Sequence, residues 1–314
     1  MELEPIYPFE PTSSYNVPEG EEWVSQIKWD GVRVLTYFDG EVVKLFNRKL
    51  NERTSIFPEL TNIKSYTEAK SFILDGEVIA LDKNGKPSFH EVMRRDGIRR
   101  LDRVSHVMKS VPIYYMIFDI VFFNGDWINN EPLKKRLEIL SKIIKQNDQV
   151  QLVPTQSDGK ALYEVCKQHD LEGIVAKNLN SQYILNGKTP DWQKIKNYKD
   201  VIAVIGAVTY RSNIVNSILI GLYDEQEQLW FIGHVGTGKL TVKEWGDLTK
   251  VVESIRIDTK PFINQPERVK EVQWLKPLLT VKVQFIDWPE GHSLRQPSIQ
   301  AFVNQDPKTC KLKQ

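Results

Sequence analysis

The sequence predicts two successive folds, a mixed α+β domain and then an all-β barrel. Short strand patterns alternate with amphipathic helical patterns up to residue 199, whereas a single helix interrupts the strand patterns that follow. The chain has 314 residues, of which 41% are hydrophobic, so its length is typical of two domains with separate cores. We therefore expect one domain over residues 1–199 and a second over residues 200–314.

The first domain is expected to contain strands that end in tight turns. Asp39-Gly40 lies between two apolar runs, which is typical of a hairpin. Helices are predicted over 131–146, with Pro132 near the start, and over 158–169, with Asp158 as the N-cap. The strands are predicted over residues 32–38, 41–46, 72–81, 113–123, 171–177 and 191–196.

The second domain reads as short strands joined by turns. One helix, over 241–255, interrupts them. A small closed barrel of the OB type accommodates about five strands in roughly a hundred residues. The clearest strand patterns lie at 201–210, 217–224, 229–236 and 279–288.

Composition narrows the class of protein. The 42 basic and 41 acidic side chains give a net charge of +1, so a nucleic-acid partner would have to be held by local patches. Two distant cysteines, Cys166 and Cys310, are expected in a reducing cytoplasm. We expect no membrane association, because no apolar run approaches the length of a membrane span, and we expect no signal peptide at the acidic, proline-containing start.

The stretch "QIKWDGVRVL" places Lys28 two residues before an Asp-Gly pair, and it has two interpretations. Lys28 is either one more charge at a turn or a nucleophile. A nucleophilic lysine must be neutral, a form that burial and nearby cations favour. Three candidate cations follow in the chain, namely Arg48, Lys194 and Lys196. The two lysines alternate, so they face one side of a strand, either toward a pocket or toward solvent.

Two glutamates and one aromatic residue complete a possible nucleotide site. Glu77 and Glu172 supply the oxygen ligands that Mg²⁺ prefers, although a glutamate such as Glu77 is also common as a surface charge. Phe118 offers a ring on which a base can stack, although it also suits a core position. Together with the cations, this set is suited to attack of a lysine amine on the α-phosphate of a nucleotide.

The motifs also occur in a familiar order. "KWDGVR", "FNRK", "LDGEVI", "YMIFDIVFFNG", "EGIVAK" and "WQKIK" resemble motifs I, Ia, III, IIIa, IV and V of ATP-dependent DNA ligases, especially the bacterial end-joining ligase D and ligase C group. "VGTGK" and "EGHSLRQPSI" are similar to stretches of that group's OB domain. The resemblance implies a nucleotidyltransferase (adenylation) domain before the OB-fold domain. It further implies a DNA repair enzyme that seals 3′-OH/5′-phosphate nicks through a lysyl-AMP intermediate.

The resemblance also assigns roles to individual residues. Lys28 would be the catalytic residue that takes AMP from ATP, and Phe118 would stack on the adenine. Glu77 and Glu172 would serve Mg²⁺ or Mn²⁺. Many family members have Glu at position 26, whereas this chain has Gln, whose carbonyl can still accept a hydrogen bond from the adenine amino group. The residues expected to bind the nucleotide are Gln26, Ile27, Arg33, Arg48, Glu77, Phe118, Lys194, Lys196 and Arg295.

Partners and alternatives follow from the same resemblance. A monomer that binds nicked or broken duplex DNA is expected, in a bacterial cytoplasm near the nucleoid, together with a Ku-like end-binding protein or a repair polymerase. The five arginines in "VMRRDGIRRLDRV" are either contacts to DNA phosphates or a solvated charged face. The alternatives are an RNA ligase or capping-type nucleotidyltransferase and, in another class, a non-catalytic nucleic-acid-binding protein.

Overall fold

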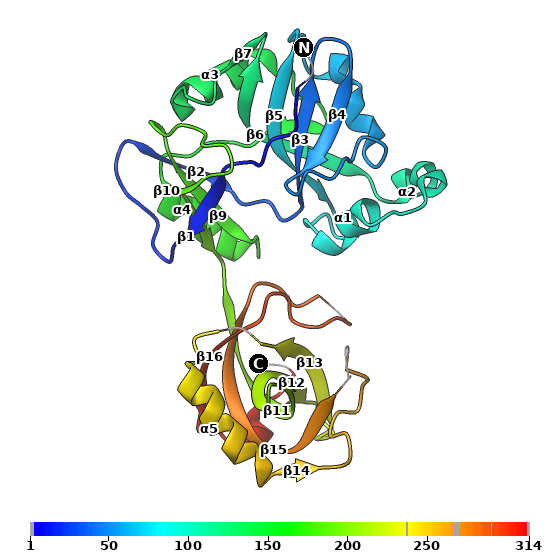
Figure 1. Ribbon diagram of the computed structural model, residues 1–314, viewed down its shortest axis with the longest axis vertical. Coiled ribbons are helices and arrows are strands. Elements are labelled where there is room, and N and C mark those ends of the chain that lie inside the picture. Colours follow the sequence, from blue (N-terminus) through cyan, green and yellow to red (C-terminus); the bar gives the residue numbers. More distant parts are fainter. Residues whose placement is uncertain (1–2, 237, 267–270, 290, 313–314) are drawn as a thin grey trace. The chain divides into compact units, whose positions relative to one another are not determined.

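The computed structural model describes residues 3–236, 238–266, 271–289 and 291–312 (Figure 1). The chain divides into two compact units, Met1–Asn197 and Tyr198–Gln314, which we describe separately. The "VGTGK" and "EGHSLRQPSI" stretches each include one residue outside the described part, at 237 and 290 respectively. Among the described residues, no helix is both long and apolar enough to cross a membrane.

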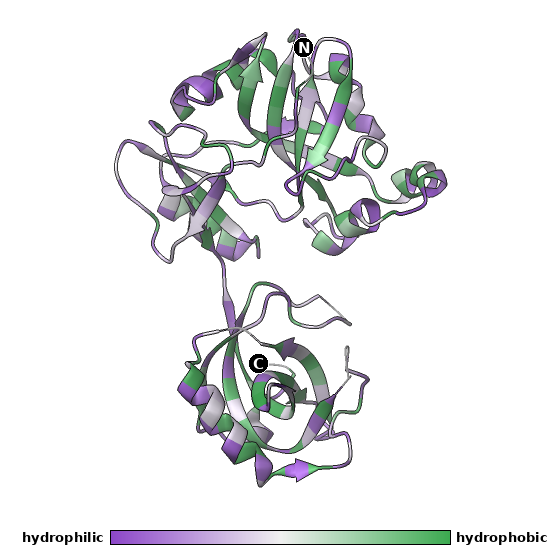
Figure 2. Ribbon diagram, viewed as in Figure 1, coloured by the Kyte–Doolittle hydropathy of each residue, from purple (hydrophilic) through white to green (hydrophobic). Residues whose placement is uncertain are grey.

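A six-stranded sheet forms the body of the first unit. Its order is β4-β3-β5-β6-β7, and β8 pairs in parallel with β6. The β3–β4 hairpin around Asp39-Gly40 is confirmed. Figure 2 shows β5 and β6 as mainly hydrophobic, because both faces of these strands are buried. The strands are β3 (Val32–Phe38), β4 (Val43–Asn47), β5 (Phe72–Ala80), β6 (Ile113–Phe123), β7 (Asp126–Trp127) and β8 (Val150–Leu152).

A smaller, four-stranded sheet completes the first unit, in the order β1-β10-β9-β2. Helix α4 (Gly159–Gln168) covers one of its faces, and Asp158 caps this helix as expected by accepting a hydrogen bond from the Ala161 N–H. Two strands, β1 and β2, were not predicted, because neither shows a clear apolar alternation. The strands are β1 (Glu10–Ser13), β2 (Trp23–Ile27), β9 (Gly173–Asn178) and β10 (Lys188–Lys196).

Three further helices pack around the large sheet. Helix α3 (Leu133–Ile143) follows Pro132, as expected, while α1 (Phe89–Asp96) and α2 (Val104–Ser110) were not predicted. Short 3₁₀ turns lie at Pro58–Thr61, Ile63–Ser65 and Leu101–Arg103. Arg136 of α3 is fully buried and pairs with the equally buried Asp119 of β6 through two hydrogen bonds of 2.8 and 3.0 Å. This ion pair ties α3 to the sheet.

The described residues of the second unit form a curled antiparallel sheet and one α-helix, α5 (Val242–Glu253). The sheet order is β13-β12-β11-β15-β14, and β16 pairs with β15. Thr241 and Glu244 form a capping box at the start of α5. Strands β14 and β16 were not predicted from the apolar pattern. The strands are β11 (Lys199–Arg211), β12 (Ile214–Tyr223), β13 (Leu229–Val235), β14 (Arg256–Ile257), β15 (Val272–Phe285) and β16 (Ser298–Val303), followed by a 3₁₀ turn at Pro307–Thr309.

We predict that Arg136→Met lowers the free energy of unfolding by about 3–5 kcal/mol, because it leaves the Asp119 carboxylate buried without its partner. Urea denaturation of the full chain measures the effect. Arg94→Met is the matched control: Arg94 pairs with Glu91 on the surface, so its loss should cost less than about 1 kcal/mol. Equal effects of the two substitutions would contradict a structural role for the buried pair.

Candidate active site

One face of the four-stranded sheet gathers the polar residues singled out in the sequence. In an antiparallel sheet, residues directly opposite each other share a face. Val175 of β9 lies opposite Gln26 of β2 and Lys194 of β10, and Lys196 lies opposite Gly173. Lys28 directly follows β2, and its backbone N–H donates to the Gly173 carbonyl at 2.9 Å. Lys28 and two of the three predicted cations, Lys194 and Lys196, therefore lie around the start of β9.

Glu172 bridges two of these lysines. Its Oε2 lies 2.6 Å from the Nζ of Lys28, and its Oε1 lies 3.3 Å from the Nζ of Lys196. The side chain of Glu172 is only 4% exposed, whereas that of Lys28 is 23% exposed and can meet a ligand. One buried carboxylate thus orients the candidate nucleophile and holds a second cation beside it.

Gly173 positions this carboxylate. Its φ is +131°, and a Cβ added there would lie 2.1 Å from the Ile195 carbonyl oxygen. Only glycine fits such a close approach between neighbouring strands. The backbone therefore requires glycine directly after Glu172, at the start of β9.

The third lysine adds to the positive field. Burial and the charges of nearby lysines, chiefly Lys196, lower the pKa of Lys194. Burial also lowers the pKa of Lys196, although the charge of Glu172 opposes this effect. Cations that repel one another across one sheet face form a site for an anion such as a polyphosphate.

Glu77 lies on the facing sheet, opposite Arg33 in the β3–β5 register. Desolvation raises its pKa to about 7, against the charges of Lys28 and Arg33, and the charge of Glu172 adds to the rise. Two carboxylates whose charges repel one another supply the oxygen ligands that a divalent cation prefers. No group of three or more His, Cys, Asp or Glu side chains suited to a metal occurs among the described residues. The chemistry of the pair fits Mg²⁺, which takes one or two carboxylates together with phosphate oxygens.

Arg33 and Phe118 lie in the space between the sheets. Arg33 makes two hydrogen bonds to Asp75, of 2.9 and 2.6 Å, and its guanidinium carbon lies 5.4 Å from the centre of the Phe118 ring. Burial disfavours the charged form of Arg33, but the charge of Asp75 raises its pKa above the ordinary value. Arg33 is therefore held as a buried cation next to Phe118.

Gln26 is a buried amide with one open acceptor. Its Nε2 donates to Thr155 Oγ1 at 3.2 Å and to the Val153 carbonyl at 3.4 Å. Its Oε1 is buried and has no hydrogen-bond partner in the part of the chain that the structure describes. A buried carbonyl oxygen without a partner is costly, and an amino group of a ligand would satisfy it.

The side chains of three other predicted residues do not belong to this face of the four-stranded sheet. The side chain of Ile27 packs against α4, on the opposite face of the small sheet from Gln26. Arg48 is a surface residue, 61% exposed, with its Nη1 3.9 Å from Glu10. Arg295 belongs to the second unit, where burial lowers its pKa to about 10 and its backbone N–H donates to Asp287.

One residue of this face was overlooked in the sequence. Lys177 is 2% exposed and lies opposite Trp192, two residues beyond Val175 on β9. The period of two within "EGIVAK", counted from Gly173, places its side chain on the same face. That signal was present, but a lysine at the end of a strand is ordinarily a surface residue.

We predict that Gly173→Ala lowers the free energy of unfolding by about 1–3 kcal/mol, because alanine has to adopt a strained φ against the Ile195 carbonyl. Urea denaturation provides the measurement. Gly246→Ala is the control, since its added Cβ meets no atom within 4 Å and the substitution should stabilise α5 by up to about 1 kcal/mol. A neutral Gly173→Ala would show that the backbone does not require glycine there.

Comparison with known proteins adds independent evidence. Residues 11–196 match the family model "ATP dependent DNA ligase domain", and residues 211–304 match "ATP dependent DNA ligase C terminal region". The chain is 28% identical, over 89% of its length, to the multifunctional non-homologous end joining DNA repair protein LigD of Mycobacterium tuberculosis. It is 33% identical, over 74% of its length, to DNA ligase 2 of Methanosarcina acetivorans. It covers 36% and 43% of these two relatives, respectively.

The fold agrees with these matches. The crystal structure of the ligase domain of M. tuberculosis LigD superimposes with a TM-score of 0.54, at 25% sequence identity and with 97% of each chain covered. The expected fold class, an adenylation domain followed by an OB-fold domain, is confirmed. The first of the two family matches alone spans more than half of the sequence. The chain belongs to the ATP-dependent DNA ligase family.

Proposed function

We propose that this chain seals nicks in duplex DNA as an ATP-dependent ligase, with Lys28 as the nucleophile. The observation that carries the proposal is the contact between Lys28 and the buried Glu172, beside Lys196, within the ligase domain. The bridge holds the Lys28 amine in place beside a second cation, Lys196. A lysine that served only as a surface charge would need no buried partner.

The reaction has three transfers. The neutral Lys28 amine attacks the α-phosphorus of ATP, so an N–P bond forms, the bond to the β-phosphate oxygen breaks and pyrophosphate leaves. An oxygen of the DNA 5′-phosphate then attacks the same phosphorus, which breaks the N–P bond and returns the lysine. Finally the 3′-hydroxyl, on losing its proton, attacks the 5′-phosphate and AMP leaves. Lys194 and Lys196 hold the charged phosphates during the first transfer.

Nucleotide recognition is assigned to the residues between the two sheets. The open Oε1 of Gln26 accepts a hydrogen bond from the adenine amino group, and Phe118 stacks on the base. Ile27 contributes through its backbone, since its side chain faces α4. The remaining predicted residues are proposed to contact the ribose and the phosphates of ATP. They are Arg33, Arg48, Glu77 and Arg295.

A divalent cation, Mg²⁺ or Mn²⁺, is proposed at Glu77 and Glu172. When bound, it would neutralise phosphate charge as a Lewis acid. The raised pKa of Glu77 supports this assignment, because a cation between the two carboxylates relieves the repulsion that contributes to that rise.

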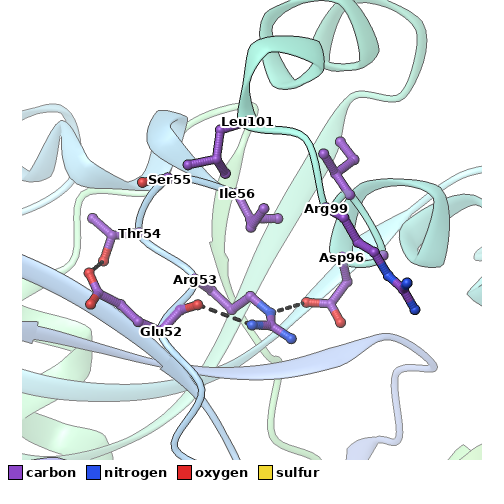
Figure 3. Close-up of a pocket in the computed structure, with 10 residues that line it drawn as sticks. Glu52, Arg53, Thr54, Ser55, Ile56, Asp96, Arg99 and Leu101 are labelled. Atoms are coloured by element: carbon purple, nitrogen blue, oxygen red, sulfur yellow. Dashed lines mark hydrogen bonds and ion pairs between the residues drawn. The ribbon is translucent and has the colours of Figure 1, made fainter.

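The DNA side of the proposal uses part of the arginine run. Arg95 is fully buried and bonds to Glu59, so it is structural, and the interpretation of the whole run as a phosphate-binding surface is wrong for this residue. Arg99 and Arg103 are exposed. Arg99 lines a cavity of about 580 Å³ next to the ion pair of Arg53 with Asp96 (Figure 3). Figure 1 shows this α1–α2 region at the edge of the first unit.

The biological setting is part of the same proposal. We infer a monomer with an adenylation domain at 1–199 and an OB-fold domain at 200–314, which acts in DNA repair. The likeness to LigD favours work beside a Ku-like end-binding protein or a repair polymerase on broken DNA. We place this work in a bacterial cytoplasm, at the nucleoid.

We predict that Lys28→Ala abolishes covalent labelling of the protein by α-³²P-ATP in the presence of Mg²⁺, because the substitution removes the proposed attacking amine. Labelling after denaturing electrophoresis is the measurement. Lys142→Ala, at an exposed position on α3, is the control and should be labelled like the wild type. Label retained by Lys28→Ala would refute the assignment. If the wild type stays unlabelled after pyrophosphate treatment, which removes bound AMP, the non-catalytic alternative is favoured.

We predict that replacing Arg99 and Arg103 together by Gln weakens binding to nicked duplex DNA. The slope of log K against log salt concentration is negative, and its magnitude should decrease by about 2, because two phosphate contacts are lost. Fluorescence anisotropy with labelled nicked DNA over a salt series measures this, with Lys142→Gln as the control. An unchanged slope would mean that the α1–α2 region does not touch DNA.

We also predict that the protein prefers DNA ends to RNA ends. Sealing of a panel of nicked DNA, nicked RNA and hybrid duplexes measures this preference.

A further inference from the structure

Lys177 is a buried lysine that the proposed reaction leaves without a role. It belongs to the face that carries the candidate site, between Val24 of β2 and Trp192 of β10. The next position toward the start of β9 on this face is Val175, which lies beside Gln26 and Lys194. Along β9, Lys177 is thus further from Lys28 than Lys194 and Lys196 are. It lies toward Phe118, the residue proposed to stack on the adenine base.

The Lys177 ammonium lies among aromatic rings. Its Nζ is 4.0 Å from the centre of the Trp192 ring and 4.5 Å from the centre of the Phe118 ring. It also donates a hydrogen bond of 3.4 Å to the Phe118 carbonyl oxygen. Phe118 and Trp192 meet edge to face, with ring centres 6.3 Å apart. One side chain therefore contacts both the ring and the backbone of Phe118, from the opposite sheet.

We propose that Lys177 is a positioning residue that fixes Phe118 for stacking on the adenine of ATP. The inference rests on the proposed stacking role of Phe118. A desolvated cation over a ring is one of the stronger side-chain contacts, and it depends on the charge of the lysine. Lys177 therefore acts through Phe118 and touches neither the phosphates nor the reacting lysine.

The charges around Lys177 make this contact sensitive to pH. Burial lowers its pKa to about 7. The ammonium is present below this value and is lost as the pH rises through it, so Phe118 is held best below pH 7. The charged groups that face Lys177 are Asp119 and Asp75, which raise its pKa, and Arg33 and Arg136, which lower it.

ATP binding to a variant that cannot form the adenylate tests the proposal. Isothermal titration calorimetry on Lys28→Ala gives the Kd from pH 6 to pH 9. Adding Lys177→Met should weaken binding about tenfold at pH 6 and much less at pH 9, where the native lysine is already neutral. Lys177→Arg keeps a cation throughout and should bind ATP tightly over the whole range. Lys142→Met is the matched lysine control and should leave the Kd unchanged.

Each outcome decides something. An equal Kd for the Lys28→Ala parent and its Lys177→Met derivative at pH 6 overturns the proposal. The same fold-change in Kd at pH 6 and pH 9 also overturns it, because it indicates a merely structural role. If Lys177→Met fails to fold by circular dichroism, Lys177→Arg decides, because an unchanged pH profile overturns the proposal. Absence of ATP binding to the parent refutes both proposals. If ATP binds in this pattern but wild-type protein forms no adenylate, only the ligase mechanism fails.

Discussion

The carboxylate of Glu172 holds together a group of cations that would otherwise repel one another. Lys28 and Lys196 each contact one of its oxygens, and Lys194 lies on the same sheet face. In surroundings from which water is largely excluded, these charges interact more strongly than they would in water. One carboxylate among three ammonium groups leaves a net positive site. Such a net charge suits a polyphosphate, while the carboxylate still orients the candidate nucleophile.

Two ion pairs with buried carboxylates hold the strands next to this site in place. Arg33 with Asp75, and Arg136 with Asp119, are ion pairs whose carboxylates are fully buried. Burying ions costs solvation energy, so such pairs are weak evidence for stability as such. Their directional hydrogen bonds instead fix the strands that carry Phe118 and Glu77. Arg33 and Asp75 join β3 to β5, and Arg136 and Asp119 join α3 to β6.

Neighbouring residues in one motif can differ completely in role. The arginine run of α1 and the turn after it contains one fully buried structural residue, Arg95, whereas its other four arginines are exposed. In "EGIVAK", alternate residues face either α4 or the site, so Lys177 shares a face with Val175 and not with Ala176. The β-strand period explains the second case, and the burial of one helix face explains the first.

The sequence alone determined the family, the α+β domain followed by a β barrel, and the set of residues from which a site is built. Tight turns, apolar runs and ordered motifs are local signals, so they can be read without a structure. Only the tertiary structure decided which charges meet: Lys28 and Glu172 are far apart in the chain and lie 2.6 Å apart in space. It also showed that Ile27 faces α4 and that Lys177 is buried against Phe118. Strand pairing and burial are long-range properties, and the chemistry of a charged side chain depends on them.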